Sequence, residues 1–280
     1  ALSIGGVGNR VAHNLIADGP HMAISYGGND HIIEFNEIHD VLLETDDAGA
    51  MYTGRDWTAR GTMIRYNYIH HSGPQYAPAV PESRQTELHV VYEPKNIHGT
   101  SLIYFDDTSP QVTTYGNILH DGYRAILLGG GRDHLIENNV FLGGEIGIWI
   151  DARALGWAQQ YAVPGGGWHM YEKLEQYNHD QPPYSTRYPR LATMLDEEPA
   201  RPLGNVYRRN IFIGTSKWHV FHGHDGEGQS LEENIYEWDE EIEIDSADPI
   251  ATLSRIPEGV LKSVGFEPIP IERIGPQREK

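Results

Sequence analysis

The chain has 280 residues. Its 31 glycines and 17 prolines are too many for a helical bundle, while a hydrophobic content of 39% suffices to bury a core. Its 40 acidic against 21 basic residues give a formal charge of −19, which disfavours a nucleic-acid partner. Cysteine is absent, so disulfides and thiolate-held zinc are excluded, and no apolar run approaches the roughly 18 residues of a membrane-spanning helix.

A short unit centred on asparagine recurs along the chain. The decapeptides GGNDHIIEFN (27–36) and GGRDHLIENN (130–139) are identical at seven of ten positions. The unit occurs at Asn14, Asn36, Asn67, Asn117, Asn139, Asn210 and Asn234. The steps between these asparagines are 22, 31, 50, 22, 71 and 24 residues. A repeat near 22 residues therefore carries insertions of about 9, 28 and 49 residues.

Short apolar segments with a period of two flank the asparagines, for example His31–Phe35 and His134–Glu137. A repeat of this length with two or three strands is one coil of a parallel β-helix, whose coils bury their inner faces by stacking. Asparagine suits the bend between two strands, because it tolerates left-handed backbone angles and its side chain pairs with the next coil. We therefore predict an all-β solenoid; a leucine-rich repeat or a β-propeller fits the repeat less well.

In chain order, the β-helix domain is expected over residues 1–245, with insertions at 73–100 and 152–203. The second insertion contains an apolar and aromatic segment, Gly167–Tyr177, that predicts one short helix, so this side insertion is expected to be partly helical. Residues 246–280 contain five prolines, which exclude an internal strand. We expect this segment to be a tail packed on or beside the last coil.

Acidic residues recur at one place in the predicted coils. Counted from the asparagine of its own coil, the eleventh or twelfth residue is Asp47 in one coil and Asp151 in another. After removal of an insertion of about 28 residues, the same place in a third coil holds Asp106 or Asp107. We expect these aspartates to lie on one strand line in successive coils, interrupted at Gly129.

Two carboxylates on the wall of a groove are the equipment of glycoside hydrolysis, in which one is protonated as the acid and the other is ionised as nucleophile or base. The pairs Asp46-Asp47 and Asp106-Asp107 both adjoin aromatic strands. Like charges that pack together raise one pKa, as an acid catalyst requires. Asp47, Asp106 and Asp107 are therefore the candidate catalytic residues. An acidic stripe for solubility, a Ca²⁺ site and aspartates in turns are the alternative interpretations.

Aromatic faces stack on sugar rings, and arginine binds hydroxyls or carboxylates. The candidate substrate-binding residues are Tyr52, Arg55, Trp57, Asp151, Trp168 and His222. A structural alternative is an Arg55–Asp56 pair with Trp57 packed against a coil. Trp168 and Tyr184 have the alternative of forming a small core within the second insertion.

Histidines follow several of the asparagine units, at His39, His70, His71 and His120. Histidines that recur at a bend favour a hydrogen-bonded stack over a metal site, so no metal is assigned.

The segment Asp46–Trp57, with the sequence DDAGAMYTGRDW, resembles the right-handed parallel β-helix proteins of glycoside hydrolase family 141 and their relatives. The resemblance extends from Gly27 to Asn210, through the segments Ile64–His70, Ile103–Asp107, Gly129–Asp133, Glu137–Asn139 and Arg187–Leu191. It implies a right-handed solenoid that hydrolyses plant or algal polysaccharides, with α-fucosidase or xylanase activity. It also implies two catalytic aspartates, which correspond to Asp47 and to Asp106 or Asp107, with Asp107 preferred. The chain departs from the family in its polar insertion at 73–100 and in lacking N-terminal coils.

Three functions are open at this point. The first is a secreted or periplasmic bacterial glycoside hydrolase that acts on a polysaccharide or oligosaccharide without a cofactor. The second is a lyase or epimerase for uronate polymers, in which Arg55 or His222 removes a proton. In that case a calcium ion would be held by Asp46, Asp47, Asp106 and Asp151. The third is a carbohydrate-binding β-helix without catalytic activity.

Overall fold

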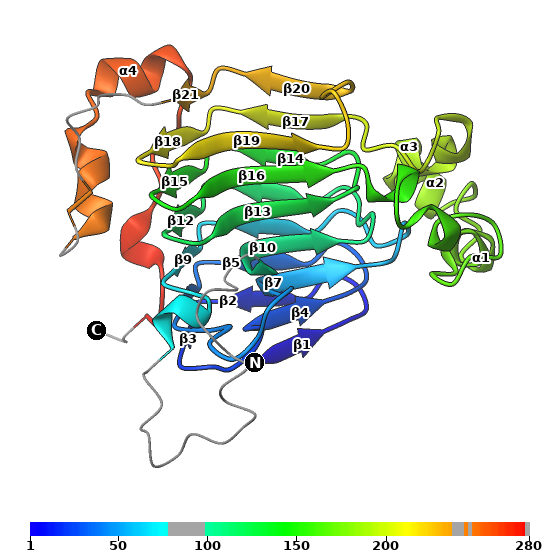
Figure 1. Ribbon diagram of the computed structural model, residues 1–280, viewed down its shortest axis with the longest axis horizontal. Coiled ribbons are helices and arrows are strands. Elements are labelled where there is room, and N and C mark those ends of the chain that lie inside the picture. Colours follow the sequence, from blue (N-terminus) through cyan, green and yellow to red (C-terminus); the bar gives the residue numbers. More distant parts are fainter. Residues whose placement is uncertain (78–98, 237–243, 246–247, 278–280) are drawn as a thin grey trace.

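The computed structural model describes residues 1–77, 99–236, 244–245 and 248–277. Three parallel sheets of seven strands run along the molecule (Figure 1). The first sheet contains β1 (Leu2–Ile4), β4 (Ile24–Tyr26), β7 (Gly49–Gly54), β10 (Ser101–Asp106), β13 (Arg124–Gly129), β16 (Ile146–Asp151) and β19 (Lys217–His222). The second contains β2 (Arg10–Ala12), β5 (Ile32–Glu34), β8 (Met63–Arg65), β11 (Thr113–Tyr115), β14 (Leu135–Glu137), β17 (Asn205–Arg208) and β20 (Gln229–Glu232). The third contains β3 (Leu15–Ile16), β6 (Glu37–His39), β9 (Tyr68–His70), β12 (Ile118–His120), β15 (Val140–Leu142), β18 (Ile211–Ile213) and β21 (Ile235–Tyr236).

Each coil contributes one strand to each sheet, so the predicted parallel β-helix architecture fits the structure. The coils stack in register, and identical faces meet from one coil to the next. In the first sheet Ile103 pairs with Met51 on one side and with Ile126 on the other, and Ile126 pairs with Ile148. All four side chains are at most 1% exposed, so they form a continuous apolar column inside the coils.

The seven asparagines form the ladder that the repeat predicts. The side-chain amide of each donates to the Oδ1 atom of the asparagine in the next coil at 2.8–3.0 Å. The backbone N–H of each donates to the same oxygen at 3.0–3.1 Å. The five inner members, from Asn36 to Asn210, are fully buried. Buried amides need partners, and the repeat supplies one from every neighbouring coil.

One detail of the bend differs from the prediction. The residue before each asparagine, rather than the asparagine itself, takes the left-handed conformation. These residues have φ values of 51–63° and are His13, Phe35, Tyr66, Gly116, Asn138, Arg209 and Glu233. The bend has two residues between a strand of the second sheet and one of the third, and the asparagine side chain must point into the stack to reach its partners. The reversed backbone angle therefore falls on the other residue of the bend.

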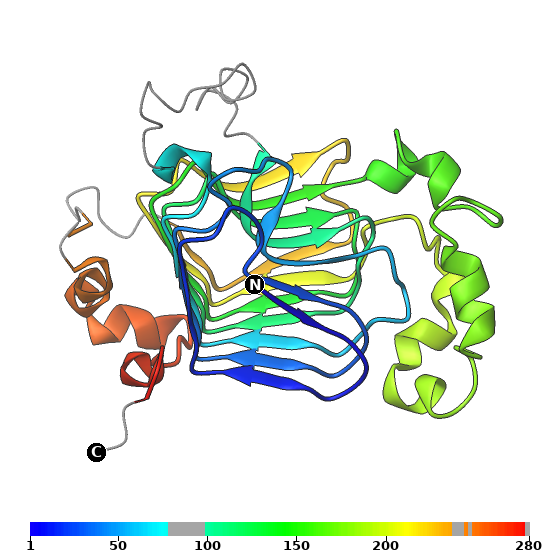
Figure 2. The same cartoon turned by 90° about the horizontal axis from the view of Figure 1, so that it is seen from below.

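The second insertion lies beside one end of the first sheet (Figure 2). It contains α1 (Met170–Gln176), α2 (Tyr184–Arg187), α3 (Pro189–Ala192) and three 3-10 helices, η5 (Arg153–Leu155), η6 (Gln159–Tyr161) and η7 (Met194–Asp196). The helix predicted within Gly167–Tyr177 is thus confirmed. A separate apolar core holds the insertion together and is made by Trp57, Met170, Leu174, Tyr188, Leu191 and Met194. Of the first insertion, a 3-10 helix η1 (Pro74–Tyr76) is described, and residues 78–98 lie outside the described residues.

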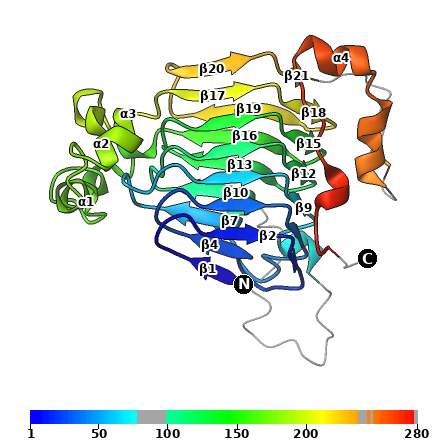
Figure 3. The same ribbon diagram turned by 180° about the vertical axis from the view of Figure 1, so that it is seen from behind.

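The C-terminal tail covers the outer face of the third sheet (Figure 3). It contains η8 (Pro249–Arg255), α4 (Glu258–Ser263) and η9 (Ile271–Arg273), and its apolar residues pack on Tyr68, Ile118, Val140, Leu142, Ile211, Ile213 and Ile235. The tail ends beside the first coils, where the backbone carbonyl of Arg273 bonds the ring of His13 at 2.9 Å and Gly275 N–H donates to the carbonyl of Phe35. The part of the chain that the structure describes contains no helix that is long and apolar enough to cross a membrane.

Candidate active site

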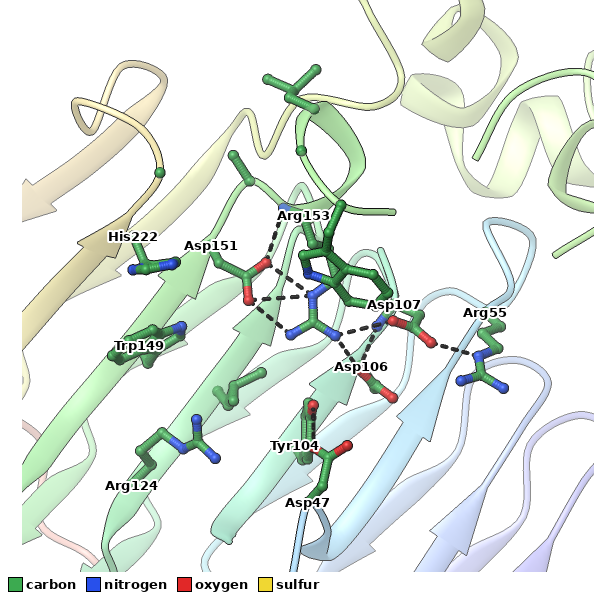
Figure 4. Close-up of a pocket in the computed structure, with 16 residues that line it drawn as sticks. Asp47, Arg55, Tyr104, Asp106, Asp107, Arg124, Trp149, Asp151, Arg153 and His222 are labelled. Carbon is green, nitrogen blue, oxygen red and sulfur yellow. Dashed lines mark hydrogen bonds and ion pairs between the residues drawn. The ribbon is translucent and has the colours of Figure 1, made fainter. Parts of the chain in front are cut away.

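A cavity of about 560 Å³ opens on the outer face of the first sheet, next to the second insertion (Figure 4). Strands β7, β10, β13, β16 and β19 or their adjoining turns contribute to its wall. Its charged residues are Asp47, Arg55, Asp106, Asp107, Arg124, Asp151 and Arg153. Four carboxylates and three guanidinium groups therefore share one small volume, flanked by the rings of Tyr104, Trp149 and Trp157.

The alternation of side chains along the strands places two rows of residues on this wall. Coil register aligns the first row as Gly54, Asp106, Gly129, Asp151 and His222. The second row lies two residues earlier in each strand and consists of Tyr52, Tyr104, Leu127, Trp149 and Val220. The predicted line of acidic residues is therefore real for the strands β10 and β16, with the predicted interruption at the glycine of β13.

Asp47 is not on this line, which corrects the sequence prediction. Gly54, and not Asp47, pairs with Asp106. The extra residues of this coil lie mostly before β7, which starts thirteen residues after Asn36, whereas β13 starts seven residues after Asn117. Asp47 consequently precedes the strand and reaches the cavity from its other end. It still lies near the row, because the hydroxyl of Tyr104 donates to its Oδ1 atom at 3.1 Å.

Arg153 is the centre of the acidic row, and its side chain is 7% exposed. Its Nε and Nη2 atoms bond the two oxygens of Asp151 at 2.9 and 2.8 Å. Its Nη1 atom donates to Oδ1 of Asp107 at 3.0 Å and also to Oδ1 of Asp106. One guanidinium thus compensates three carboxylates that are themselves at most 8% exposed.

Gly129 explains how the arginine fits between two acidic strands. A Cβ atom at this position would lie 2.5 Å from the guanidinium carbon of Arg153. Glycine leaves the wall of β13 open at this point, so the guanidinium group rests directly on the backbone between Asp106 and Asp151. The interruption in the acidic line is therefore the place that the compensating charge occupies.

Asp107 has the most perturbed environment of the four carboxylates. It is 2% exposed, and its Oδ2 atom accepts a bond from Nε of Arg55 at 2.5 Å. Burial and then the charge of Asp106 raise the pKa of Asp107, and the bonds from Arg55 and Arg153 offset part of this increase. Asp107 therefore retains a proton at a higher pH than an aspartate in water.

Two tyrosines orient the other carboxylates. Tyr52 donates to Oδ2 of Asp106 at 2.6 Å, and Tyr104 donates to Asp47. Burial raises the pKa of both hydroxyls well above the usual range. Both tyrosines therefore stay protonated and act as donors to the acids. Asp47 is exposed, and among the described residues the one side chain that donates to it is Tyr104, through Oδ1.

The predicted substrate-binding residues separate into two groups. Arg55, Asp151 and His222 line the cavity, and the His222 ring lies 5.0 Å from that of Trp149. Tyr52 reaches the cavity through its bond to Asp106. The prediction for Trp57 is corrected: this side chain is fully buried in the core of the insertion, and its Nε1 atom donates to Thr108 at 3.0 Å.

Trp168 also belongs mainly to the insertion. It packs against the core of the insertion and stacks on Tyr161 with ring centres 5.6 Å apart. The guanidinium of Arg55 lies 6.0 Å from the centre of the Trp168 ring, so this tryptophan borders the site through Arg55 and does not line the cavity. Tyr184 likewise packs against the insertion core, as the structural alternative predicted.

Sequence reasoning missed the following charged and aromatic residues of the wall: Tyr104, Arg124, Trp149, Arg153 and Trp157. Two of them had a signal in the sequence. Tyr104 and Trp149 each lie two residues before a row aspartate and therefore share its face of the strand. Arg153 follows Asp151 by two residues, but it lies in a turn, where strand alternation no longer predicts direction.

The histidines that were predicted to stack do so on the third sheet, away from the cavity. The rings of His39 and His70 lie 4.9 Å apart at an angle of 18°. Nδ1 of His70 lies 2.7 Å from Nδ1 of His71, and His120 is level with His70 in the next coil. Burial, and then the neighbouring histidines, lower the pKa of His70 to about 3, so it stays neutral. The described residues contain no cluster of three or more histidine or acidic side chains placed to hold a metal ion.

Comparison of the chain with models of protein families, with curated proteins and with solved structures finds no match. The chemistry of the site is therefore derived from its own groups. These groups are a carboxyl whose pKa is raised, an exposed carboxylate across the cavity, aromatic rings and fixed arginines. Groups of these kinds can transfer a proton, and exposed aromatic rings can stack on a ring-shaped polar ligand.

Proposed function

We propose that the protein is a glycoside hydrolase that acts on a plant or algal polysaccharide, similar to family 141, with fucosidase- or xylanase-like activity. The observation that carries the proposal is the single cavity that Asp47, Asp106 and Asp107 share with the rings of Trp149 and Trp157. Sugar rings stack on tryptophan faces, and carboxylates next to such a face are placed at a glycosidic bond.

Asp107 is the proton donor in this proposal. Its raised pKa lets it retain a proton to a higher pH than an aspartate in water. The charge of the adjacent Asp106 contributes to that raised pKa. After the proton has passed to the leaving group, Asp107 takes a proton from the attacking water molecule. Arg55 and Arg153 hold both oxygens of Asp107 in place.

Asp47 is the base or nucleophile. It reaches the cavity from the opposite end of the strands, and the hydroxyl of Tyr104 fixes one of its oxygens. The other oxygen is available to a water molecule or to the anomeric carbon of a sugar.

Two further expectations belong to the proposal. We infer that the coils wind with a right hand, because connections between parallel strands of one sheet are right-handed in about 98% of cases. We also place the enzyme outside the cytoplasm, in the periplasm or secreted from a bacterium, where polysaccharides are met. Determination of the coil hand by crystallography would test the first expectation, and fractionation of the producing cells would test the second.

The test is a screen of fucosylated, xylan and uronate-containing glycans with the wild type and two variants. Asparagine is isosteric with aspartate and tolerates the left-handed angles of Asp47 (φ 45°) and Asp107 (φ 39°). We expect Asp47→Asn to lower kcat by about 10²- to 10⁴-fold without changing the melting temperature. Asp107→Asn should abolish turnover, because it removes the proposed proton donor, and should leave the melting temperature close to that of the wild type, because the raised pKa of Asp107 shows that the fold does not favour its charged form.

Asp196→Asn is the matched control, since Asp196 is exposed on the insertion and lies outside the cavity. It should keep full activity. Full activity of Asp47→Asn would contradict the assignment of Asp47. Firm glycan binding by the wild type without turnover of any glycan would support the binding-protein alternative instead.

A uronate lyase is the second candidate, because Arg124 and His222 lie in the same cavity and provide a cation and a base. The calcium ion of this alternative fits poorly. Asp106, Asp107 and Asp151 already bond Arg153, so they do not present free oxygens to a divalent cation. A product with the absorbance of an unsaturated sugar, formed equally with and without EDTA, would identify the lyase.

A further inference from the structure

The three arginines of the cavity differ in their partners. Arg55 bonds Asp107, and Arg153 bonds three carboxylates. Arg124 has no carboxylate within ion-pair distance among the residues that the structure describes. Its Nη2 atom donates to the carbonyl of Gly99, and its buried Nε atom has no hydrogen-bond partner in that part of the chain.

The guanidinium of Arg124 is placed toward the cavity and not toward the surface. Figure 4 shows it between Trp149 and Tyr104, directed at the centre of the site. Its central carbon lies 5.8 Å from the middle of the Trp149 ring. Among the described residues, Asp47 and Asp46 act on this cation through space, but neither forms an ion pair with it. A ligand anion that reached the guanidinium would therefore gain a strong, charge-assisted hydrogen bond.

We propose that the substrate is an acidic glycan, and that Arg124 binds the anionic group of a sugar whose ring stacks on Trp149. The cleavage of such a glycan rests on the proposed function, whereas its binding by Arg124 does not. The fitting groups are a uronate carboxylate or a sulfate ester, because both offer two oxygens that can accept parallel hydrogen bonds from the N–H groups along the edge of a guanidinium group.

The negative net charge of the protein means that a preference for acidic sugars must come from a local positive group. A formal charge of −19 opposes non-specific attraction of an acidic polymer. Binding of such a glycan therefore requires a positive charge close to its anionic group. Arg55 and Arg153 are already paired with carboxylates of the cavity. Loss of Arg124 alone should accordingly remove the preference for acidic over neutral sugars.

The experiment measures binding by calorimetry and turnover by product analysis for matched pairs of glycans. One pair is short oligogalacturonates and their methyl-esterified forms, and the other is sulfated and desulfated galactan oligosaccharides. We expect the wild type to bind the acidic member of one pair more tightly, which identifies the carboxylate or the sulfate. Arg124→Met, which keeps the aliphatic stem, should weaken that binding about 10- to 100-fold and leave the neutral member unaffected. Arg124→Lys should recover part of the loss.

Lys217→Met is the control, because Lys217 lies at the start of β19 on the same sheet, is exposed and is paired with Glu145. It should bind both members of each pair as the wild type does. Arg124-dependent binding of an acidic glycan that is never cleaved would support this inference and contradict the proposed hydrolase. Cleavage of neutral glycans that depends on Asp47 but not on Arg124 would overturn this inference and leave the hydrolase standing. Equal loss of acidic and neutral binding in Arg124→Met, with an unchanged melting temperature, would also overturn it.

Discussion

Replacing Arg153 by methionine tests the electrostatic organisation of the cavity most directly. The change removes the charge and keeps a side chain of similar length. It leaves three carboxylates at most 8% exposed without their shared cation. Removal of one partner from a buried ion pair costs about 3–5 kcal/mol, so we expect the free energy of unfolding at pH 7 to fall by about 4 kcal/mol.

The size of the chain converts this loss into a melting temperature. About 2.1 cal/mol/K of unfolding entropy per residue gives roughly 0.6 kcal/mol/K for the whole chain, so the melting temperature should fall by about 7 °C. The pKa of Asp107 is already raised in the wild type, and loss of the bond from Arg153 raises it further. Acid then protonates Asp107 more readily in the folded variant, so the difference from the wild type should shrink as the pH falls from 7 toward 4.

The assay is thermal unfolding followed by circular dichroism at several pH values. Arg201→Met is the control, since Arg201 forms its ion pairs with Glu198 and Glu227 at the surface and should melt as the wild type does. The double variant Arg153→Met with Asp151→Asn should recover part of the loss, because it removes one uncompensated charge. A melting temperature of Arg153→Met close to that of the wild type at pH 7, or a difference that widens in acid, would refute the reasoning.

The remaining predictions concern the solenoid itself. Asn139→Ala removes the oxygen that accepts two bonds from Asn117. Unfolding in denaturant should show that the free energy of unfolding falls by about 2–4 kcal/mol. If it falls no more than in Asn14→Ala, at the half-buried end of the ladder, the ladder contributes little to stability. His134 is neutral, because burial lowers its pKa to about 4, while the unfolded chain takes up a proton near pH 6.5. Stability should therefore decrease as the pH falls from 6.5 to 4, by up to about 3 kcal/mol from this residue, and His134→Gln should flatten that decrease. An unchanged slope in the variant would assign the acid sensitivity to other groups.

The repeat could be predicted from the sequence because the asparagine ladder requires one asparagine at the same place in every coil. A buried asparagine needs the same partner in each neighbouring coil, so the residue recurs visibly. The position of extra residues within a coil leaves no such trace. Counting from Asn36 placed Asp47 in the acidic row, whereas most of the additional residues lie before β7 and move it off the row.

The acidic residues of the candidate site and Arg55 were predicted from the sequence, whereas Arg124 and Arg153 were missed. Asp106 and Asp151 lie in strands, where the period of two fixes their face. Arg153 lies in the turn after β16, and its direction depends on the space above Gly129, which becomes visible once the coils are in register. The prediction for Trp57 was wrong because the residues that it packs against lie in the second insertion, far along the chain. No local sequence pattern indicates these contacts.

The tail on the third sheet changes how the stack as a whole comes apart. In a solenoid whose coils contact only their immediate neighbours, coils unfold one at a time from an end, because an end coil has half the contacts of an inner coil. Here a single segment is anchored by apolar contacts from Ile235 in the last coil and by hydrogen bonds at His13 and Phe35 in the first two. Separation of the first two described coils, or of the coil that holds Ile235, must also detach this segment, so the segment couples the unfolding of these coils to one another.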